Sequence, residues 1–259
     1  MDLGLTGKSV VITGGTTGIG KAIANILLQE GCHVTVSGRN KEKGNSLIEE
    51  FTVLGHNITY ECADASKSDE VGRFAENAVK RYGSIDVWIN NAGIYPQRKL
   101  LEMTEEEWDE VMHVNLKSVW LGSKVAAGYM RQGKGGVILN AASFASILPS
   151  AGSGAYAASK AGILSMTRTL AAELAPHHIR VNAYIPGVIE TPMTESNIEK
   201  NQANIMETIA LRKLGKPEDI AHAVAFMASN VSSYMTGTHM EISGGKFCVQ
   251  NPMFAWKEQ

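Results

Sequence analysis

Cysteine is scarce in this sequence, and the three positions exclude a protein held together by disulfides or by a metal bound to cysteines. Cys32, Cys62 and Cys248 are odd in number and far apart, so they form neither a disulfide framework nor a metal-binding pattern. The seven histidines include no HExxH motif. We therefore expect no metal site and a reducing compartment, the cytoplasm.

Long apolar runs and an excess of one charge are also missing. No run approaches the length of a membrane span, and the first residues lack the basic, apolar and small-residue pattern of a secretion signal. The 24 basic and 26 acidic residues nearly cancel, which leaves a net charge of −2. This balance favours neither a nucleic acid nor an anionic membrane as partner.

Short apolar strand patterns alternate with helical patterns along the whole chain. Seven Val- and Ile-rich segments read as strands, and those between them carry apolar residues at helical spacing. The alternation predicts an α/β protein, a Rossmann-type doubly wound, seven-stranded parallel sheet with helices on both faces. No linker interrupts residues 1–259, so we expect a single domain with a mobile lid at about 187–213 and a C-terminal tail at 246–259.

The first strand pattern runs directly into a glycine-rich turn, TGGTTGIG, from Thr13 to Gly20. A helical pattern follows, so Gly14, Gly18 and Gly20 lie between a strand and a helix. Such a turn lets a pyrophosphate approach the backbone and the positive end of the helix. The spacing is G-x-x-x-G-x-G, and a turn that binds nothing is the alternative.

The second strand pattern ends in Ser37, Gly38, Arg39 and Asn40, without the acid that holds a ribose 2′-hydroxyl in many dinucleotide folds. Arg39 would instead pair with a 2′-phosphate, which favours NADP over NAD. Thr17 supplies no second positive charge, and a surface role for Arg39 remains the alternative.

Ser143, Tyr156 and Lys160 have a spacing that suits hydride chemistry. On a helix, Tyr156 and Lys160 stand one turn apart on one face. An ammonium there would lower the phenol pKa and make Tyr156 a usable acid and base. Ser143 follows the apolar run GGVILNAA, at the strand end where open α/β sheets bind ligands. The pair Tyr95 and Lys99 has the same spacing, but Pro96 makes a shared helical face improbable.

Taken together, these motifs resemble the short-chain dehydrogenase/reductase family in its single-domain branch. The resemblance covers about residues 5–245 and rests on motifs in the family's order. They are TGGTTGIG at Thr13, Asp64 after the third strand, NNAG at Asn90, VNL with Asn115, ILNAAS ending at Ser143, YAASK at Tyr156 and IPGVIET at Ile185.

The resemblance implies a role for each matching residue. Tyr156 would be the general acid and base, with Lys160 lowering its pKa and binding the nicotinamide ribose. Ser143 would bind the substrate oxygen, and Asn115 would hold a water that links Lys160 to solvent. The predicted cofactor-binding residues are Gly14, Thr16, Thr17, Gly18, Ile19, Gly20, Arg39, Asp64, Ala65, Asn91, Ala92, Gly93, Tyr156, Lys160, Pro186, Gly187, Ile189 and Thr191.

The substrate itself is not fixed by the sequence. Ser143, Tyr95, Phe144 and Met193 are the predicted contacts, and further candidate walls are Ile94, Gln97, Ile147, Leu148, Pro149 and Ser153. The expected activity is hydride transfer between NADP(H), or NAD(H), and a carbonyl or secondary alcohol. A 3-ketoacyl-carrier-protein reductase is the alternative, with only modest basic support from Arg131 and Lys134. A dinucleotide sensor without activity is a third interpretation, but it predicts loss of Ser, Tyr or Lys.

Two helical patterns carry more small and apolar residues than one sheet face needs. They contain Met112, Leu116, Val119 and Trp120 in one, and Ala155, Ala158, Ala161 and Ile163 in the other. Pairing of such faces predicts a homotetramer or a dimer. The tail residues Phe247, Phe254 and Trp256 would be buried in the same assembly, unless the tail is disordered.

Overall fold

Seven strands form one parallel sheet in the computed structural model, which describes residues 2–246 and 248–256. The strands are β1 (Ser9–Thr13), β2 (His33–Gly38), β3 (Ile58–Cys62), β4 (Val87–Asn90), β5 (Gly136–Ala141), β6 (Ile179–Pro186) and β7 (His239–Ile242). Their order is β3-β2-β1-β4-β5-β6-β7, and every neighbouring pair is parallel. The predicted sheet is confirmed.

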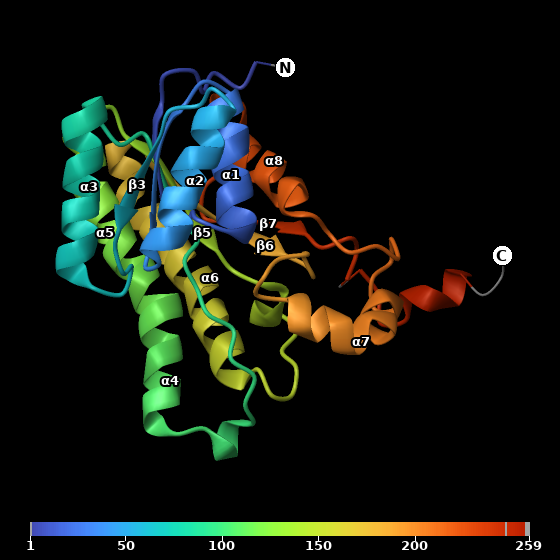
Figure 1. Ribbon diagram of the computed structural model, residues 1–259. Helices are drawn as coiled ribbons and strands as arrows, with labels where there is room; N and C mark the ends of the chain where they lie inside the picture. Colours follow the sequence, from blue (N-terminus) through green and yellow to red (C-terminus); the bar gives the residue numbers. More distant parts are fainter. Residues whose placement is uncertain (1, 247, 257–259) are drawn as a thin grey trace.

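Helices cover both faces of this sheet (Figure 1). They are α1 (Gly18–Gln29), α2 (Lys41–Val53), α3 (Ser68–Tyr82), α4 (Glu105–Val111), α5 (Ser118–Met130), α6 (Gly154–Leu174), α7 (Glu195–Glu207) and α8 (Pro217–Ala228). The buried residues of α1, α2 and α8 join one hydrophobic core, and those of α3, α5 and α6 join a second. The doubly wound arrangement is therefore confirmed as well.

The first strand shows why the apolar runs are continuous. Val10 and Ile12 point into the core below α1 and α8, whereas Val11 points into the opposite core beside Phe74 and Trp88. Successive side chains of a strand face opposite sides of the sheet, so a sheet covered on both faces needs apolar residues at every position.

The carboxyl ends of the central strands meet at one edge of the sheet. β1 ends at Thr13, β4 at Asn90, β5 at Ala141 and β6 at Pro186. The order of the strands reverses between β1 and β4, because later strands add on the far side of β1. Open α/β sheets form their ligand crevice at such a switch point.

The sequence pattern of residues 103–130 predicts one long helix that starts with a capping box of Thr104 and Glu107, but in the structure this helix is interrupted. Between α4 and α5, the segment Met112–Lys117 is π-helical. The predicted capping box at the start of α4 is confirmed: Glu107 N donates to Thr104 Oγ1 at 3.2 Å, and Thr104 N to Glu107 Oε2 at 3.0 Å. A π-helical turn leaves the apolar pattern nearly intact, so the pattern does not reveal it.

Two polar helices are absent from the sequence prediction. α2 buries only Gly44, Leu47 and Phe51, which is too few for a clear helical pattern. α7 lies inside the stretch 187–213, which was expected to be a mobile lid and shows no clear helical pattern; it buries none of its residues and is kinked at Asn201. Among the described residues, no helix has the length and hydropathy to cross a membrane.

A buried polar network fixes α5 and α6 against the sheet. Asn90 Nδ2 donates to Asn140 Oδ1 at 2.9 Å and to Ser123 Oγ at 3.1 Å. Trp88 Nε1 donates to Asn90 Oδ1 at 2.7 Å, and Asn140 Nδ2 donates to Thr167 Oγ1 at 2.9 Å. A satisfied network of this kind holds its elements in one relative position, so α6 is fixed beside the end of β5.

Candidate active site

At three positions of the glycine-rich turn a side chain would cause strain or a clash. Gly14 has a φ of 65° and Gly18 a φ of 52°, which other residues rarely adopt. A Cβ atom at Gly20 would lie 2.2 Å from the Gly14 carbonyl oxygen. α1 begins at Gly18, and its N-cap residue Thr17 makes no side-chain cap hydrogen bond. The first N–H groups of the helix therefore remain available to an anion in the cleft.

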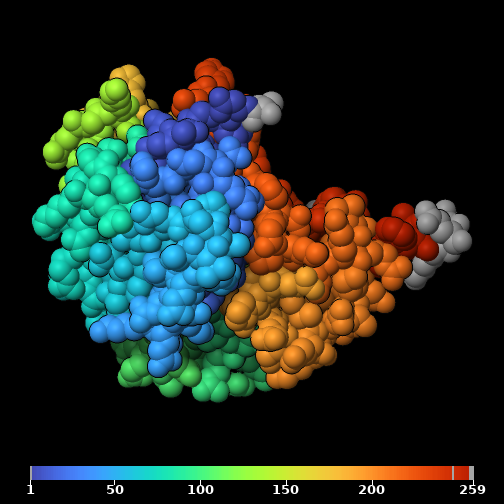
Figure 2. All heavy atoms as spheres, turned by 45° about the horizontal axis from the view of Figure 1, so that its top comes forward, coloured from blue at the N-terminus to red at the C-terminus, as the bar shows by residue number. Residues whose placement is uncertain are grey.

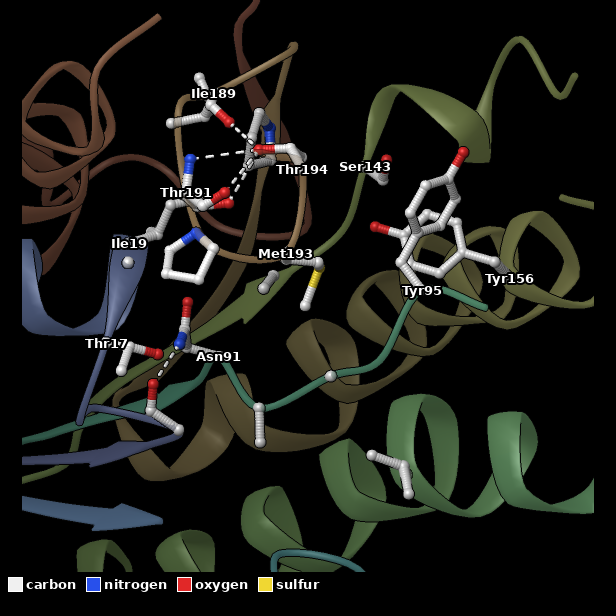
Figure 3. Close-up of a pocket in the computed structure, with 18 of the residues that line it drawn as sticks. Thr17, Ile19, Asn91, Tyr95, Ser143, Tyr156, Ile189, Thr191, Met193 and Thr194 are labelled. Atoms are coloured by element: carbon white, nitrogen blue, oxygen red, sulfur yellow. Dashed lines mark hydrogen bonds between the residues drawn. The ribbon is translucent and has the colours of Figure 1, made fainter. Parts of the chain in front are cut away.

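Asn91 holds this turn from the neighbouring strand. Its Nδ2 donates to the Gly14 carbonyl oxygen at 2.9 Å, drawn as a dashed line in Figure 3. The Tyr184 hydroxyl donates to Asn91 Oδ1 at 3.1 Å. Asn91 lines the cleft as expected, but its amide also positions the turn, and Tyr184 is a supporting residue that sequence reasoning missed.

Positive charge gathers where the second strand ends. Arg39 lies at this end of the cleft as predicted, and Lys43 on the first turn of α2 joins it. Lys43 supplies the second cation that Thr17 does not, and it was missed because α2 itself was not recognised.

Asp64 lies nearby, also at the cleft. Its burial raises the pKa of the carboxyl group, but hydrogen bonds from Ser66 and the charge of Arg39 outweigh this and leave the pKa below its usual value. Asp64 is therefore ionised at neutral pH.

The segment after β6 closes the cleft opposite the glycine turn. Thr191 N donates to Thr194 Oγ1 at 3.1 Å, and Thr194 Oγ1 donates to the Ile189 carbonyl oxygen (Figure 3). A Cβ atom at Gly18 would lie 3.3 Å from the Thr191 side chain. Thr194, which the sequence did not single out, thus shapes the loop that carries the predicted nicotinamide contacts.

Ser143, Tyr156 and Lys160 come together on the other side of the cleft. Ser143 lies two residues after the end of β5, and its Oγ accepts from Ala145 N at 3.2 Å. Lys160 Nζ lies 5.6 Å from the centre of the Tyr156 ring, one turn away on α6. Figure 3 shows the hydroxyl groups of Ser143 and Tyr156 facing the same space.

Burial, not the Lys160 charge, dominates the ionisation of this pair. Burial raises the pKa of Tyr156 to about 12, although hydrogen bonding to Ser143 lowers it in part. Burial also lowers the pKa of Lys160 to about 8, and its Nζ donates to the Ala141 carbonyl oxygen at 2.7 Å. Lys160 was expected to lower the Tyr156 pKa, whereas desolvation, which opposes both charged forms, instead holds it above its usual value.

Asn115 lies behind this site, in the π-helical segment. Its Oδ1 accepts from Ile94 N at 2.8 Å, and its Nδ2 donates to Ile94 O at 3.0 Å and to Ser159 Oγ at 3.3 Å. The amide thus fixes the loop after β4 to α6. A second lone pair on Oδ1 can still accept from a water, as the predicted relay requires.

The substrate side of the cleft has one aromatic wall. The Tyr95 ring meets the Tyr156 ring edge-on with centroids 4.7 Å apart, and Gln97 Nε2 donates to the Tyr95 hydroxyl at 3.1 Å. Phe144 and Met193 line the same cleft. Of the further predicted walls only Ser153 lines it, whereas Ile94, Gln97, Ile147, Leu148 and Pro149 do not. Ser150 lines it and was not predicted.

One continuous cleft of about 380 Å³ joins all these parts. Among the predicted catalytic and cofactor-binding residues, only Gly20 and Asn115 do not line it, because Gly20 packs beneath the turn and Asn115 lies behind the loop of Gly93. A glycine turn at the switch point of a parallel sheet, joined to a Ser-Tyr-Lys group, defines a dinucleotide-dependent oxidoreductase.

Comparison with known proteins identifies the family. A family model described as enoyl-(acyl carrier protein) reductase matches residues 14–246. The chain is 42% identical over 241 residues to the 3-oxoacyl-(acyl-carrier-protein) reductase FabG of Thermotoga maritima, which covers 93% of this chain and 98% of the relative. It is 38% identical to the protein of the same name from Chlamydia pneumoniae, over 95% of this chain and 99% of that one.

Solved structures agree. A short-chain type dehydrogenase/reductase from Mycobacterium marinum superposes with a TM-score of 0.90 at 34% identity, over 95% of this chain and 97% of that one. The chain belongs to the short-chain dehydrogenase/reductase family, and its cofactor is a nicotinamide dinucleotide.

Proposed function

We propose that this protein reduces a ketone, or oxidises the corresponding secondary alcohol, with NADP(H) as the hydride carrier. The observation that carries the proposal is the convergence of the Ser143 and Tyr156 hydroxyl groups on the cleft that the glycine turn opens. Two hydroxyl donors on one side of a cleft suit a carbonyl oxygen that gains negative charge.

Each residue has a distinct task in this mechanism. The chemistry that a nicotinamide would supply when bound is the hydride that adds to the carbonyl carbon or, in the reverse direction, the acceptor for the hydride of the alcohol carbon. Ser143 holds the carbonyl oxygen by a hydrogen bond, and Tyr156, kept protonated by its raised pKa, donates its proton to that oxygen. Lys160 holds the cofactor ribose and, while charged, favours the tyrosinate that the transfer leaves behind.

Arg39 and Lys43 support NADP(H) over NAD(H). Both side chains are exposed cations at the end of the cleft beyond the glycine turn, and the second strand ends without an acid. A charge-assisted hydrogen bond to a phosphate is worth about 1.5–3 kcal/mol, which corresponds to about tenfold to a hundredfold in affinity.

The test is a screen of ketones and alcohols with both cofactors, with Arg39→Ala and Lys43→Ala as variants. We expect a higher kcat/KM with NADPH than with NADH, and a loss of that preference in Arg39→Ala. Lys41→Ala, an exposed lysine on the same helix that does not line the cleft, is the matched control. Equal or better efficiency with NADH in the unaltered protein would contradict the cofactor preference.

A 3-oxoacyl thioester is a second candidate substrate, and the names of the relatives favour it. Its keto oxygen would accept the hydrogen bond of Ser143 and the proton of Tyr156, as the oxygen of a simple ketone would. Turnover of acetoacetyl thioesters with a kcat/KM well above that of simple ketones would support this candidate.

Residues 187–213, which follow β6, are proposed as a lid over the cleft. A homotetramer is proposed as the assembly. On α6, Ala158 and Ala161 are exposed, whereas Ala155 and Ile163 are buried within the chain. On α5, Trp120 is 46% exposed while Val119 is buried. The predicted excess apolar face is thus narrower than the sequence suggested, and Ala158, Ala161 and Trp120 form what remains of it.

A further inference from the structure

Lys246 is a half-buried cation that packs against Phe144, a residue of the active-site cleft, and the mechanism does not use it. Its Nζ lies 5.1 Å from the centre of the Phe144 ring and donates to Thr208 Oγ1 at 2.5 Å. Phe144 directly follows Ser143 and lines the cleft. Thr208 follows the last residue of α7. Lys246 therefore joins the active-site loop to the end of the proposed lid.

Within the described part of the chain, the Lys246 ammonium has no carboxylate at ion-pair distance. Two neighbouring acidic groups are otherwise placed: Glu241, five residues before Lys246, accepts from the Ser243 hydroxyl, and Glu207, next to Thr208, is exposed at the end of α7. Burial lowers the pKa of Lys246, as expected for a cation without a counter-charge. An aromatic face and one hydroxyl compensate only part of its lost hydration.

Further positive charge lies on the adjoining segment. Arg212, with a φ of 49°, places its guanidinium 5.6 Å from the centre of the Trp256 ring, and Lys213 follows it. Arg212 also has no ion pair among the described residues. Lys246, Arg212 and Lys213 thus lie on adjoining segments, which are called the rim, and Lys246 is the half-buried member that contacts Phe144.

We infer that Lys246 binds an anionic group of the substrate, and that the protein selects ketones carrying such a group. The inference rests on the proposed function, because the ketone must reach Ser143 and Tyr156. A carboxylate or phosphate at the outer end of the substrate restores the counter-charge that Lys246 lacks. The apolar walls Phe144 and Met193 then enclose the carbon chain between the keto group and the anion.

Two sources of the anion are distinguished by the assay. A carboxylate of the substrate itself is tested with 3-, 4-, 5- and 6-oxo acids of matched chain length, each against its methyl ester. A phosphate of a thioester carrier is tested with acetoacetyl-coenzyme A against acetoacetyl-N-acetylcysteamine, which is neutral. Steady-state kcat/KM with NADPH is measured for every pair.

The variants are Lys246→Met, Lys246→Arg and the control Lys213→Met, which removes an exposed charge from the same rim. For at least one substrate pair, we expect the kcat/KM of the unaltered protein to be about tenfold or more higher for the anionic member than for the neutral one. Lys246→Met should remove that preference and change the neutral member less than twofold, whereas Lys246→Arg and Lys213→Met should retain it. The midpoint of thermal unfolding confirms that each variant is folded.

Turnover without any anionic preference would overturn the inference while leaving the proposed function intact. Equal reduction of the preference by Lys246→Met and Lys213→Met would also overturn the inference, because the preference would then come from the summed positive charge of the rim and not from Lys246. No turnover of any ketone or thioester by the unaltered protein would instead contradict the proposed function.

Discussion

At Tyr156 and Lys160, burial acts on two neighbouring ionisable groups in opposite directions. It raises the pKa of the phenol to about 12 and lowers that of the ammonium to about 8. Both groups are thus biased toward their neutral forms in the ligand-free chain. For Tyr156 this bias is useful in the direction of reduction, because the residue enters each turnover as a proton donor.

Replacing Tyr156 by Phe tests that role directly. The ring still packs against Tyr95, but the proton is lost, so we expect ketone reduction to fall by about a hundredfold or more. Cofactor affinity, measured by fluorescence titration with NADPH, should change little. Activity within threefold of the unaltered protein would contradict the assignment.

The Lys160 pKa predicts a specific pH dependence. Below about pH 8 the ammonium is charged and attracts the cofactor, and as the pH rises through about 8 the charge is lost. The kcat/KM for NADPH reports groups of the free enzyme, so it should fall with a midpoint near pH 8. Lys160→Met should have a low kcat/KM for NADPH without this transition. A flat profile of the unaltered protein between pH 7 and 9.5 would show that the charge of Lys160 does not govern cofactor capture.

The site residues that the sequence predicted are those whose spacing reflects local structure. Tyr156 and Lys160 share a helix, and the glycines of the turn follow directly from a strand, so both patterns are visible in a few consecutive residues. Tyr184 reaches Asn91, and Lys246 reaches Phe144, only through the fold, because these partners are distant in sequence and no spacing rule reveals them. Lys43 is close to Arg39 in sequence but was missed because α2 has too few buried residues for a clear helical pattern.

Helices and strands were predictable from the sequence where their own residues carry a clear apolar pattern, and not where they lack one. All seven strands and the helices with a wide apolar face were predictable from periodicity. α7 was not, because a helix without buried residues has no apolar stripe to detect. The π-helical turn that carries Asn115 was also hidden, since it differs from an α-helix in hydrogen bonding more than in pattern.

The contact of α5 with the sheet gives a prediction for Gly122. A Cβ atom there would lie 2.2 Å from Asn90 Oδ1 and 2.6 Å from Trp88 Nε1, inside the buried polar network. We expect Gly122→Ala to lower the free energy of unfolding by about 1–3 kcal/mol, measured by urea denaturation.

Gly128 on the same helix is the matched control. A Cβ atom at Gly128 meets nothing within 4 Å, so Gly128→Ala should be neutral or stabilise the protein by up to about 1 kcal/mol. Equal effects of the two substitutions would mean that the network does not constrain α5.

At the scale of the whole molecule, the C-terminal tail packs against its own chain. Residues Pro252–Trp256 form a short 3-10 helix, and Trp256 Nε1 donates to the Ala210 carbonyl oxygen at 3.0 Å. Phe254 is 71% exposed, and Phe247 lies outside the described residues. Figure 2 shows the tail and α7 as a lobe that projects beside the body of the molecule.

The last prediction concerns the mass of the proposed tetramer. Light scattering should give a mass of about 111 kDa, four times the 27.8 kDa of the chain. Trp120→Glu places a charge on the exposed face of α5 and should reduce the mass to that of a dimer or a monomer, because an unpaired charge is costly in a closed interface. Val53→Glu, at an exposed apolar position at the end of α2, should leave the mass unchanged. A mass near 28 kDa for the unaltered protein would reject the assembly, and an unchanged mass for Trp120→Glu would move the interface away from α5.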